Sequence, residues 1–216
     1  MNLKKIISDL MNSIGSENLS SILRDSGEVV LDNVLNEGVL RDIPFCNFAV
    51  SAYKLKVEND YRSFIKKVTN FLEELPNVSH EEAQNFVESI EQNPKEKRIF
   101  EEILLLLIDR ADSLEKPSIL GRLLKHHILR NISYDDAMRL SSIVDRVYMP
   151  HLNYLTSFTY GIQSNPNIAA SLQSAGLLNL AGIDGGNLDE PCSEGLIYEL
   201  NDYGKMLLKY GLDSAI

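Results

Sequence analysis

Carboxylate side chains gather in the middle of the 216-residue chain, where Glu101, Glu102, Asp109 and Asp112 follow one another closely. Two buried carboxylates could bind a metal ion or act as the acid and base of a hydrolase. Glu102 and Asp109 have a spacing that places them on one face of a helix. However, the Glu-x-x-His motif of di-iron helix bundles does not accompany them. We therefore interpret Asp109, Arg110 and Asp112 as a local cluster of ion pairs and helix caps, and predict no metal site and no cofactor.

Histidine, cysteine and serine residues form no catalytic motif in this sequence. His126 and His127 are adjacent on a predicted helix, so their side chains point about 100° apart and cannot easily bind one ion. Cys46 and Cys192 have no His or Cys at ligand spacing. The G-x-S-x-G turn of hydrolases and the phosphate-binding G-x-x-x-x-G-K-[ST] loop are both absent. We predict no catalytic residues, which argues against an enzyme without excluding one.

The strongest basic patch contains Arg122, Lys125 and Arg130, with His126 and His127 interleaved. Three positive charges on a helix commonly form no more than a solvated surface. An anion or a nucleic acid, if the protein binds one, should contact Arg122, Lys125, His126 and Arg130.

The overall composition is that of an acidic globular protein. The net charge is −10, with 31 acidic and 21 basic side chains, which lowers the expectation of nucleic-acid binding. No apolar run reaches the roughly 18 residues that a membrane span requires. The start MNLKK leads into a segment interrupted by polar residues rather than into the core of a signal peptide. We therefore predict a cytoplasmic protein without a membrane span.

Apolar residues recur at helical spacing throughout most of residues 1–160. The most hydrophobic segment of this region is 99–130. It predicts two antiparallel helices joined by a short link, around which the other helices pack. Serines followed by acidic residues predict helix starts at Ser79 and Ser133. Apolar stripes in residues 1–36 predict further helices, which could pack in the core or bind a partner.

Residues 161–216 have a different pattern. Residues 168–176 predict a short helix, residues 177–183 and 196–200 two strands around a glycine-rich loop, and residues 202–210 a final helix. The segment resembles the ending of many winged-helix domains, L-x-x-x-G-L followed by Y-x-L-T-x-x-G. The matching residues are Leu172, Gly176, Leu177, Tyr198, Leu200, Gly204 and Leu207. Asn201 stands where that pattern usually has Thr.

The winged-helix resemblance would ordinarily imply DNA binding, with the short helix in the major groove and the hairpin on the phosphate backbone. From Val147 to Gly204, however, the sequence contains no Lys or Arg, and its predicted wing carries several acidic residues. Such a surface cannot make the six to ten phosphate contacts of a typical DNA-binding protein. We therefore interpret the tail as a winged-helix shape used for protein contact.

The middle of the chain is similar to bacterial and prophage helical proteins of the abortive-infection alpha kind. The similarity lies in LRDIP at 40–44, LLLLIDRADSLEK at 104–116, LGRLL at 120–124 and ISYDDAMRLSSIVDRV at 132–147. It implies a link to phage defence and brings no catalytic motif with it.

These observations predict a mainly α protein, with a multi-helix domain at 1–160 and a small winged-helix-like α+β segment at 161–216. The leading hypothesis is a non-enzymatic interaction protein, associated with phage defence or a prophage, that binds a protein partner or a second copy of itself. Two alternatives stay open. One is a winged-helix DNA-binding regulator, and the other is a metal-dependent hydrolase that uses the central carboxylates.

Overall fold

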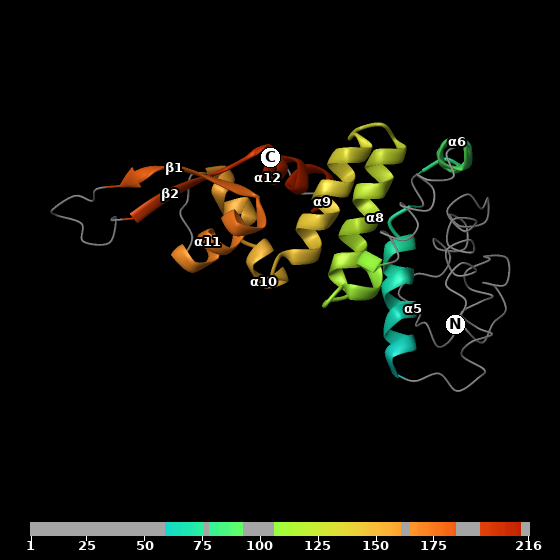
Figure 1. Cartoon of the computed structure of the whole chain (residues 1–216), viewed down its shortest axis with the longest axis horizontal. Coiled ribbons are helices and arrows are strands. Elements are labelled where there is room, and N and C mark those ends of the chain that lie inside the picture. The colour runs from blue at the N-terminus through green and yellow to red at the C-terminus, as the bar shows by residue number, and fades with distance from the viewer. Residues whose placement is uncertain (1–58, 76–77, 93–105, 161–164, 185–194, 213–216) are drawn as a thin grey trace. The chain divides into compact units, whose positions relative to one another are not determined.

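The computed structural model describes residues 59–75, 78–92, 106–160, 165–184 and 195–212 (Figure 1). The described part is mainly helical, with a two-stranded antiparallel sheet near the C-terminus. The chain forms two compact units that divide between Ile132 and Ser133, whereas the change in sequence pattern placed a boundary between 160 and 161. The helices predicted within residues 1–58 and the predicted helical residues 99–105 lie outside the described part. None of the described helices is both long and apolar enough to cross a membrane.

The first unit contains α5 (Asn59–Leu72), α6 (His80–Glu91), α8 (Glu115–Ile128) and a helical segment at 106–110. α8 corresponds to the second helix of the predicted central pair, and it packs against both α5 and α6. α5 and α8 carry side chains that are almost fully inaccessible, among them Val68, Phe71, Leu72, Ile119 and Leu123. Sequence reasoning paired α8 with the preceding helix and did not identify α5 as its main described neighbour.

Two helix starts predicted from serine are present as hydrogen-bonded caps. Ser79 and Glu82 form the complete capping box of α6, since the Ser79 hydroxyl accepts from the Glu82 N–H and the Glu82 carboxylate accepts from the Ser79 N–H. Ser133 caps α9 (Tyr134–Arg146) by accepting from the Asp136 N–H at 3.1 Å. Each cap satisfies one of the backbone N–H groups that the first helical turn leaves without a partner.

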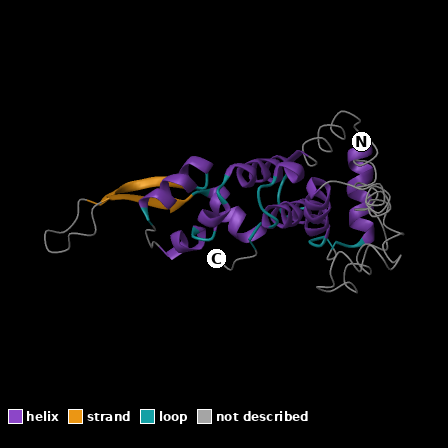
Figure 2. Ribbon diagram, turned by 90° about the horizontal axis from the view of Figure 1, so that it is seen from below, coloured by secondary structure: helices purple, strands orange, loops and turns teal. Residues whose placement is uncertain are grey.

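The second unit continues from α9 through α10 (Met149–Leu152) and the 3-10 helix η2 (Leu155–Tyr160) to α11 (Pro166–Ala175). β1 (Leu178–Asp184), β2 (Gly195–Leu200) and α12 (Asp202–Tyr210) follow. Figure 2 shows the strands side by side, with their ends reaching beyond the helices of this unit. The predicted order of helix, strand, strand and helix is confirmed, and the bounds of α12 agree with the prediction, while residues 185–194 of the predicted loop lie outside the described part.

The first part of the winged-helix-like pattern makes the turn from α11 into β1. Gly176 adopts a left-handed conformation with φ of 94°, and the Leu177 N–H donates to the Leu172 carbonyl at 3.0 Å. Leu172 and Leu177 are both fully buried. This is a Schellman motif with glycine at the left-handed position and an apolar contact across the turn.

The second part of the pattern joins β2 to α12. The Asn201 side chain accepts from the Gly204 N–H at 2.8 Å and so caps α12, while its amide group donates to the Gly176 carbonyl at 2.9 Å. A Cβ on Gly204 would overlap the Leu177 carbonyl oxygen. Asn201 therefore does more than the usual Thr could do at this position, because a Thr hydroxyl can cap the helix but has no amide to reach Gly176.

We expect the two roles of Asn201 to separate in a substitution series. Asn201→Ala should reduce the free energy of unfolding by about 2 kcal/mol, of which the cap contributes about 1 kcal/mol and the bond to Gly176 about 1 kcal/mol. Asn201→Thr should lose only the second part. Urea denaturation followed by circular dichroism measures both values. A Thr variant as stable as the original protein would mean that the bond to Gly176 contributes nothing.

Candidate functional site

The strand register of the hairpin collects apolar side chains on one face. Leu178 pairs with Leu200 and Leu180 with Tyr198, and the register then shifts so that Ile183 pairs with Leu196. Directly opposed residues of antiparallel strands lie on the same face of the sheet. The shift leaves Ala181 as an extra, bulged residue in β1. Because of this bulge, Ile183 shares a face with the other apolar residues instead of pointing to the opposite side.

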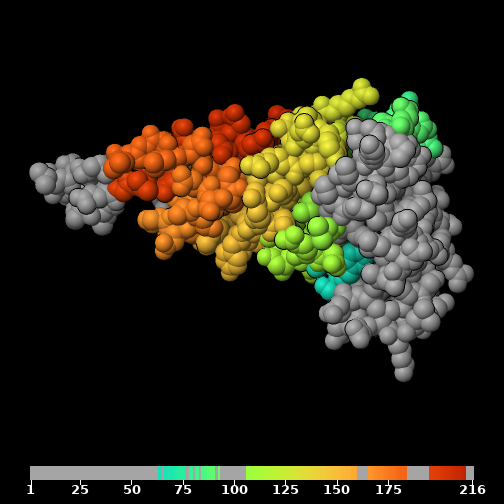
Figure 3. All heavy atoms as spheres, viewed as in Figure 1, coloured from blue at the N-terminus to red at the C-terminus, as the bar shows by residue number. Residues whose placement is uncertain are grey.

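Only part of this apolar face is covered by the unit's own helices. Leu178, Tyr198 and Leu200 are buried against the body of the unit. Leu180, Ile183 and Leu196 are 48%, 76% and 50% exposed, and we call these three residues the hairpin apolar face. The atoms of both strands lie at the surface of the unit in Figure 3. Contiguous exposed aliphatic side chains of this kind mark interaction surfaces more often than isolated ones do.

The sequence segment that contains the hairpin apolar face carries no positive charge. The sequence from Leu178 to Asp202 contains six acidic residues and no Lys or Arg, and Glu199 and Asp202 are exposed. The exposed side chains of α11, where a winged-helix protein would contact DNA, are uncharged, as at Asn167 and Gln173. Within the described part of the second unit, Lys and Arg occur only on α9 and α12, at Arg139, Arg146, Lys205 and Lys209.

The four residues predicted to contact an anion differ in their surroundings. Arg122 forms an ion pair with Glu74 at 3.2 Å, and Lys125 is buried. The ring of His126 lies 3.0 Å from the Asn131 amide nitrogen. Arg130 is exposed just beyond the end of α8. The structure therefore does not join the four into a single basic surface, and Arg130 is the member whose charge is most accessible.

The central carboxylates show no arrangement for metal binding within the described residues, and Glu101 and Glu102 lie outside them. Asp112 pairs with Lys116 at 2.9 Å, and the Lys116 side chain is almost fully buried. The side chain of Asp109 is exposed, and its backbone carbonyl accepts a hydrogen bond from Lys67 at 2.7 Å. These contacts hold the segment before α8 in place.

Sequence reasoning predicted a protein-contact surface in the acidic tail but did not single out the hairpin apolar face. Leu180, Ile183 and Leu196 read as ordinary strand residues, and only the bulge and the exposed fractions single them out. Searches of family models, of curated proteins and of solved structures find no match to this chain.

Proposed function

We propose that this is a non-enzymatic interaction protein whose second unit binds a protein partner through the hairpin apolar face. The observation that carries the proposal is the alignment of Leu180, Ile183 and Leu196 on one side of two paired strands, where the unit's own core does not cover them. Burying such side chains contributes about 25 cal/mol per Å² of apolar area removed from water. A partner that covers them therefore binds with a favourable hydrophobic free energy.

The partner should carry Lys or Arg around an apolar centre. The six acidic residues between Leu178 and Asp202 give this part of the chain a formal charge of −6. Opposite charges across an interface speed association and select against acidic partners. The partner class is therefore a protein surface, including one on a second copy of this chain, with an apolar centre and a basic rim.

A winged-helix-like arrangement of the second unit belongs to the same proposal. It is supported by the order of α11, β1, β2 and α12 and by the roles of the pattern residues: Leu172 and Leu177 are buried, Gly176 makes the turn, and Gly204 lies against the Leu177 carbonyl just before β1. In this arrangement the β1–β2 hairpin is the wing. The similarity of the middle of the chain to abortive-infection alpha proteins supports a setting in phage defence or a prophage, within the cytoplasm.

The experiment introduces a photo-crosslinking amino acid at Leu196 of the full chain in cells, and the captured protein is identified by mass spectrometry. Binding of that purified protein is then measured with the Ile183→Asp variant. We expect at least tenfold weaker binding, because a carboxylate would enter the apolar contact and be desolvated there. Binding should also weaken as the salt concentration rises. The 76% exposure of Ile183 means that this substitution leaves the core intact.

Two positions provide controls for this experiment. Asn179→Asp adds the same charge to an exposed position on the opposite face of β1 and should leave binding within about twofold of the original. A crosslinker at Gln173 on α11 should capture much less of the partner. Equal capture from Gln173, or undiminished binding by Ile183→Asp, would overturn the proposed site.

The winged-helix DNA-binding regulator has a separate test. It requires salt-dependent binding of duplex DNA that involves the cations of α9 and α12, because the described residues of α11 and the hairpin provide none. Binding of a labelled duplex at low salt, together with loss of that binding in the double variant Lys205→Glu/Lys209→Glu, would favour that regulator over a protein-interaction module.

A further inference from the structure

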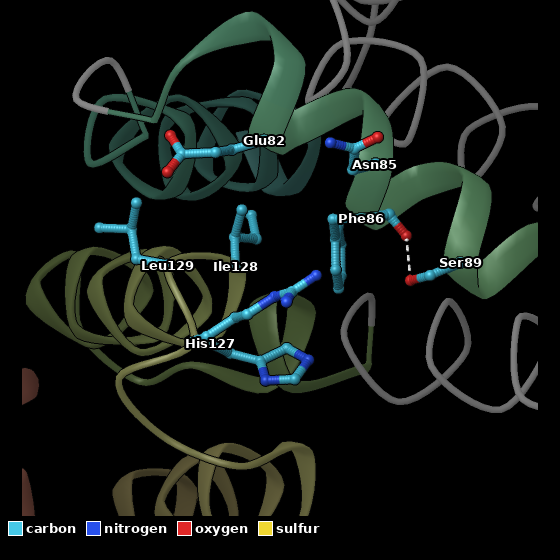
Figure 4. Close-up of a pocket in the computed structure, with 8 residues that line it drawn as sticks. Glu82, Asn85, Phe86, Ser89, His127, Ile128 and Leu129 are labelled. Carbon is cyan, nitrogen blue, oxygen red and sulfur yellow. Dashed lines mark hydrogen bonds between the residues drawn. The ribbon is translucent and has the colours of Figure 1, made fainter.

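A pocket of about 360 Å³ lies in the first unit between α6 and the end of α8. Figure 4 shows Glu82, Asn85, Phe86 and Ser89 on α6, opposite the residues at the end of α8. Their spacing of three, four and seven residues places these four side chains on one face of the helix. The opposite side is formed by His127, Ile128, Leu129 and Arg130. A volume of this size suits a small organic molecule.

Arg130 has an unusual backbone conformation at the edge of this pocket. Its φ of 59° is the only positive value at a non-glycine residue within the described part of the chain. The Arg130 N–H donates to the His127 carbonyl, and the Asn131 N–H donates to the His126 carbonyl, each at 2.9 Å. These two bonds make a Schellman motif in which Arg130 takes the left-handed position that is usually glycine.

The Schellman motifs at the ends of α8 and α11 differ in a way that stability does not explain. At the end of α11 the left-handed residue is Gly176, and two buried leucines meet across the turn. At the end of α8 the left-handed residue is an arginine, and the contact across the turn is polar, between Asn131 and His126. A left-handed conformation disfavours any residue with a Cβ, whereas glycine adopts it freely.

The helix dipole does not account for Arg130 either. A basic residue near a helix C-terminus is favourable, but Lys125, His126 and His127 already supply basic groups in the last turn of α8. Arg130 instead adds a guanidinium group at the pocket. It does so from a left-handed backbone position that disfavours any residue with a Cβ. Backbone strain of this kind is commonly found where a side chain is needed for function.

Two side chains of the pocket, Arg130 and Asn85, have N–H donors that no side chain of the described residues uses. Neither the Arg130 guanidinium nor the Asn85 amide has an ion pair or hydrogen bond to a side chain of the described residues. The Glu82 carboxylate, in contrast, accepts from both the hydroxyl and the N–H of Ser79, and these bonds lower the pKa of Glu82. Phe86 and Ile128 provide apolar surface, and the His127 ring is held edge-on to Phe86 at 5.6 Å.

We propose that this pocket binds a small organic anion, with its carboxylate or phosphate group on Arg130 and Asn85 and its apolar body against Phe86 and Ile128. A planar guanidinium with five N–H donors matches both anionic groups. The site is independent of the hairpin apolar face and of the protein partner proposed for it.

The experiment titrates the ¹⁵N-labelled full chain with phenyl phosphate and, separately, with benzoate, which distinguishes the two anionic groups. We expect saturable shifts of backbone amide signals in residues 82–89 and 127–131. Arg130→Gln should weaken binding of the better probe about tenfold or more, since a charge-assisted bond is lost. Arg130→Gly should weaken it equally and remain folded, because glycine suits the left-handed position. The matched control is Arg146→Gln, which removes an exposed arginine of the second unit and should leave the affinity unchanged.

Two further probes complete the test. Benzylamine has the same ring with the opposite charge and should cause no comparable shifts, and inorganic phosphate, which lacks the apolar body, should bind at least tenfold more weakly than phenyl phosphate. The proposal is overturned by the absence of saturable shifts with both anions, by equal binding of benzylamine, by inorganic phosphate binding as tightly as phenyl phosphate, or by Arg130→Gln binding as tightly as the original protein.

Discussion

Gly121→Ala should destabilise the first unit by about 2 kcal/mol. A Cβ at this position would overlap the Phe71 carbonyl oxygen on α5 and approach the Glu74 Cβ to 3.0 Å. A backbone carbonyl cannot rotate away, so α5 and α8 must separate, and overpacking of this kind costs about 3 kcal/mol at the upper end of its usual range. Alanine returns about 1 kcal/mol through its higher helix propensity.

Chemical denaturation followed by circular dichroism measures this loss, and hydrogen exchange of the α8 amides locates it. Gly182→Ala is the matched control, because a Cβ on Gly182 would meet no atom within 4 Å and its φ is not in the left-handed region. We expect that control to change the stability by less than about 0.5 kcal/mol. If both alanine variants unfolded at the same denaturant concentration, the close approach of α5 and α8 would not be a rigid constraint.

Gly204→Ala should have a similar or larger effect on the second unit, about 2 to 3 kcal/mol. The added Cβ would overlap the Leu177 carbonyl oxygen and lie 2.9 Å from the Leu200 Cδ2 atom. That carbonyl also accepts the Asn201 N–H at 3.2 Å, so moving α12 away would strain this bond together with the helix cap. The expected fall in the thermal midpoint is roughly 10 °C for a unit of this size.

Hydrogen exchange again identifies the affected region, since the amides of α12 and β2 should lose protection while those of α8 keep theirs. Gly195→Ala tests the same substitution at the start of β2, where a Cβ would meet no atom within 4 Å. A Gly204→Ala protein with the thermal midpoint of Gly195→Ala would contradict the close approach of α12 to the Leu177 carbonyl, just before β1.

The sequence by itself determined the features that depend on neighbouring residues. The capping box of Ser79 and Glu82, the cap at Ser133 and the glycine turn at Gly176 were predictable, because each needs only residue types at fixed short spacings. The two strands and α12 followed from the apolar pattern, and their predicted bounds agree with the structure to within one residue. The mainly helical character was predictable for the same reason.

The tertiary structure decided which side chains are accessible and which segments pack together. Helical spacing showed that α8 has an apolar face, but not that α5 packs on it at Gly121, since that contact joins residues far apart in the sequence. Charge counting grouped Arg122 with Arg130. In the fold, Arg122 forms an ion pair with Glu74, whereas Arg130 lines the pocket between α6 and the end of α8.

The candidate site shows the same limit. Strict alternation along β1 would place Ile183 on the face opposite Leu180, and the bulge at Ala181 reverses that placement. A bulge depends on how the two strands pair, and whether an apolar side chain is buried depends on how far the helices extend over the sheet. Both are properties of contacts between distant segments, which the local pattern of residues does not specify.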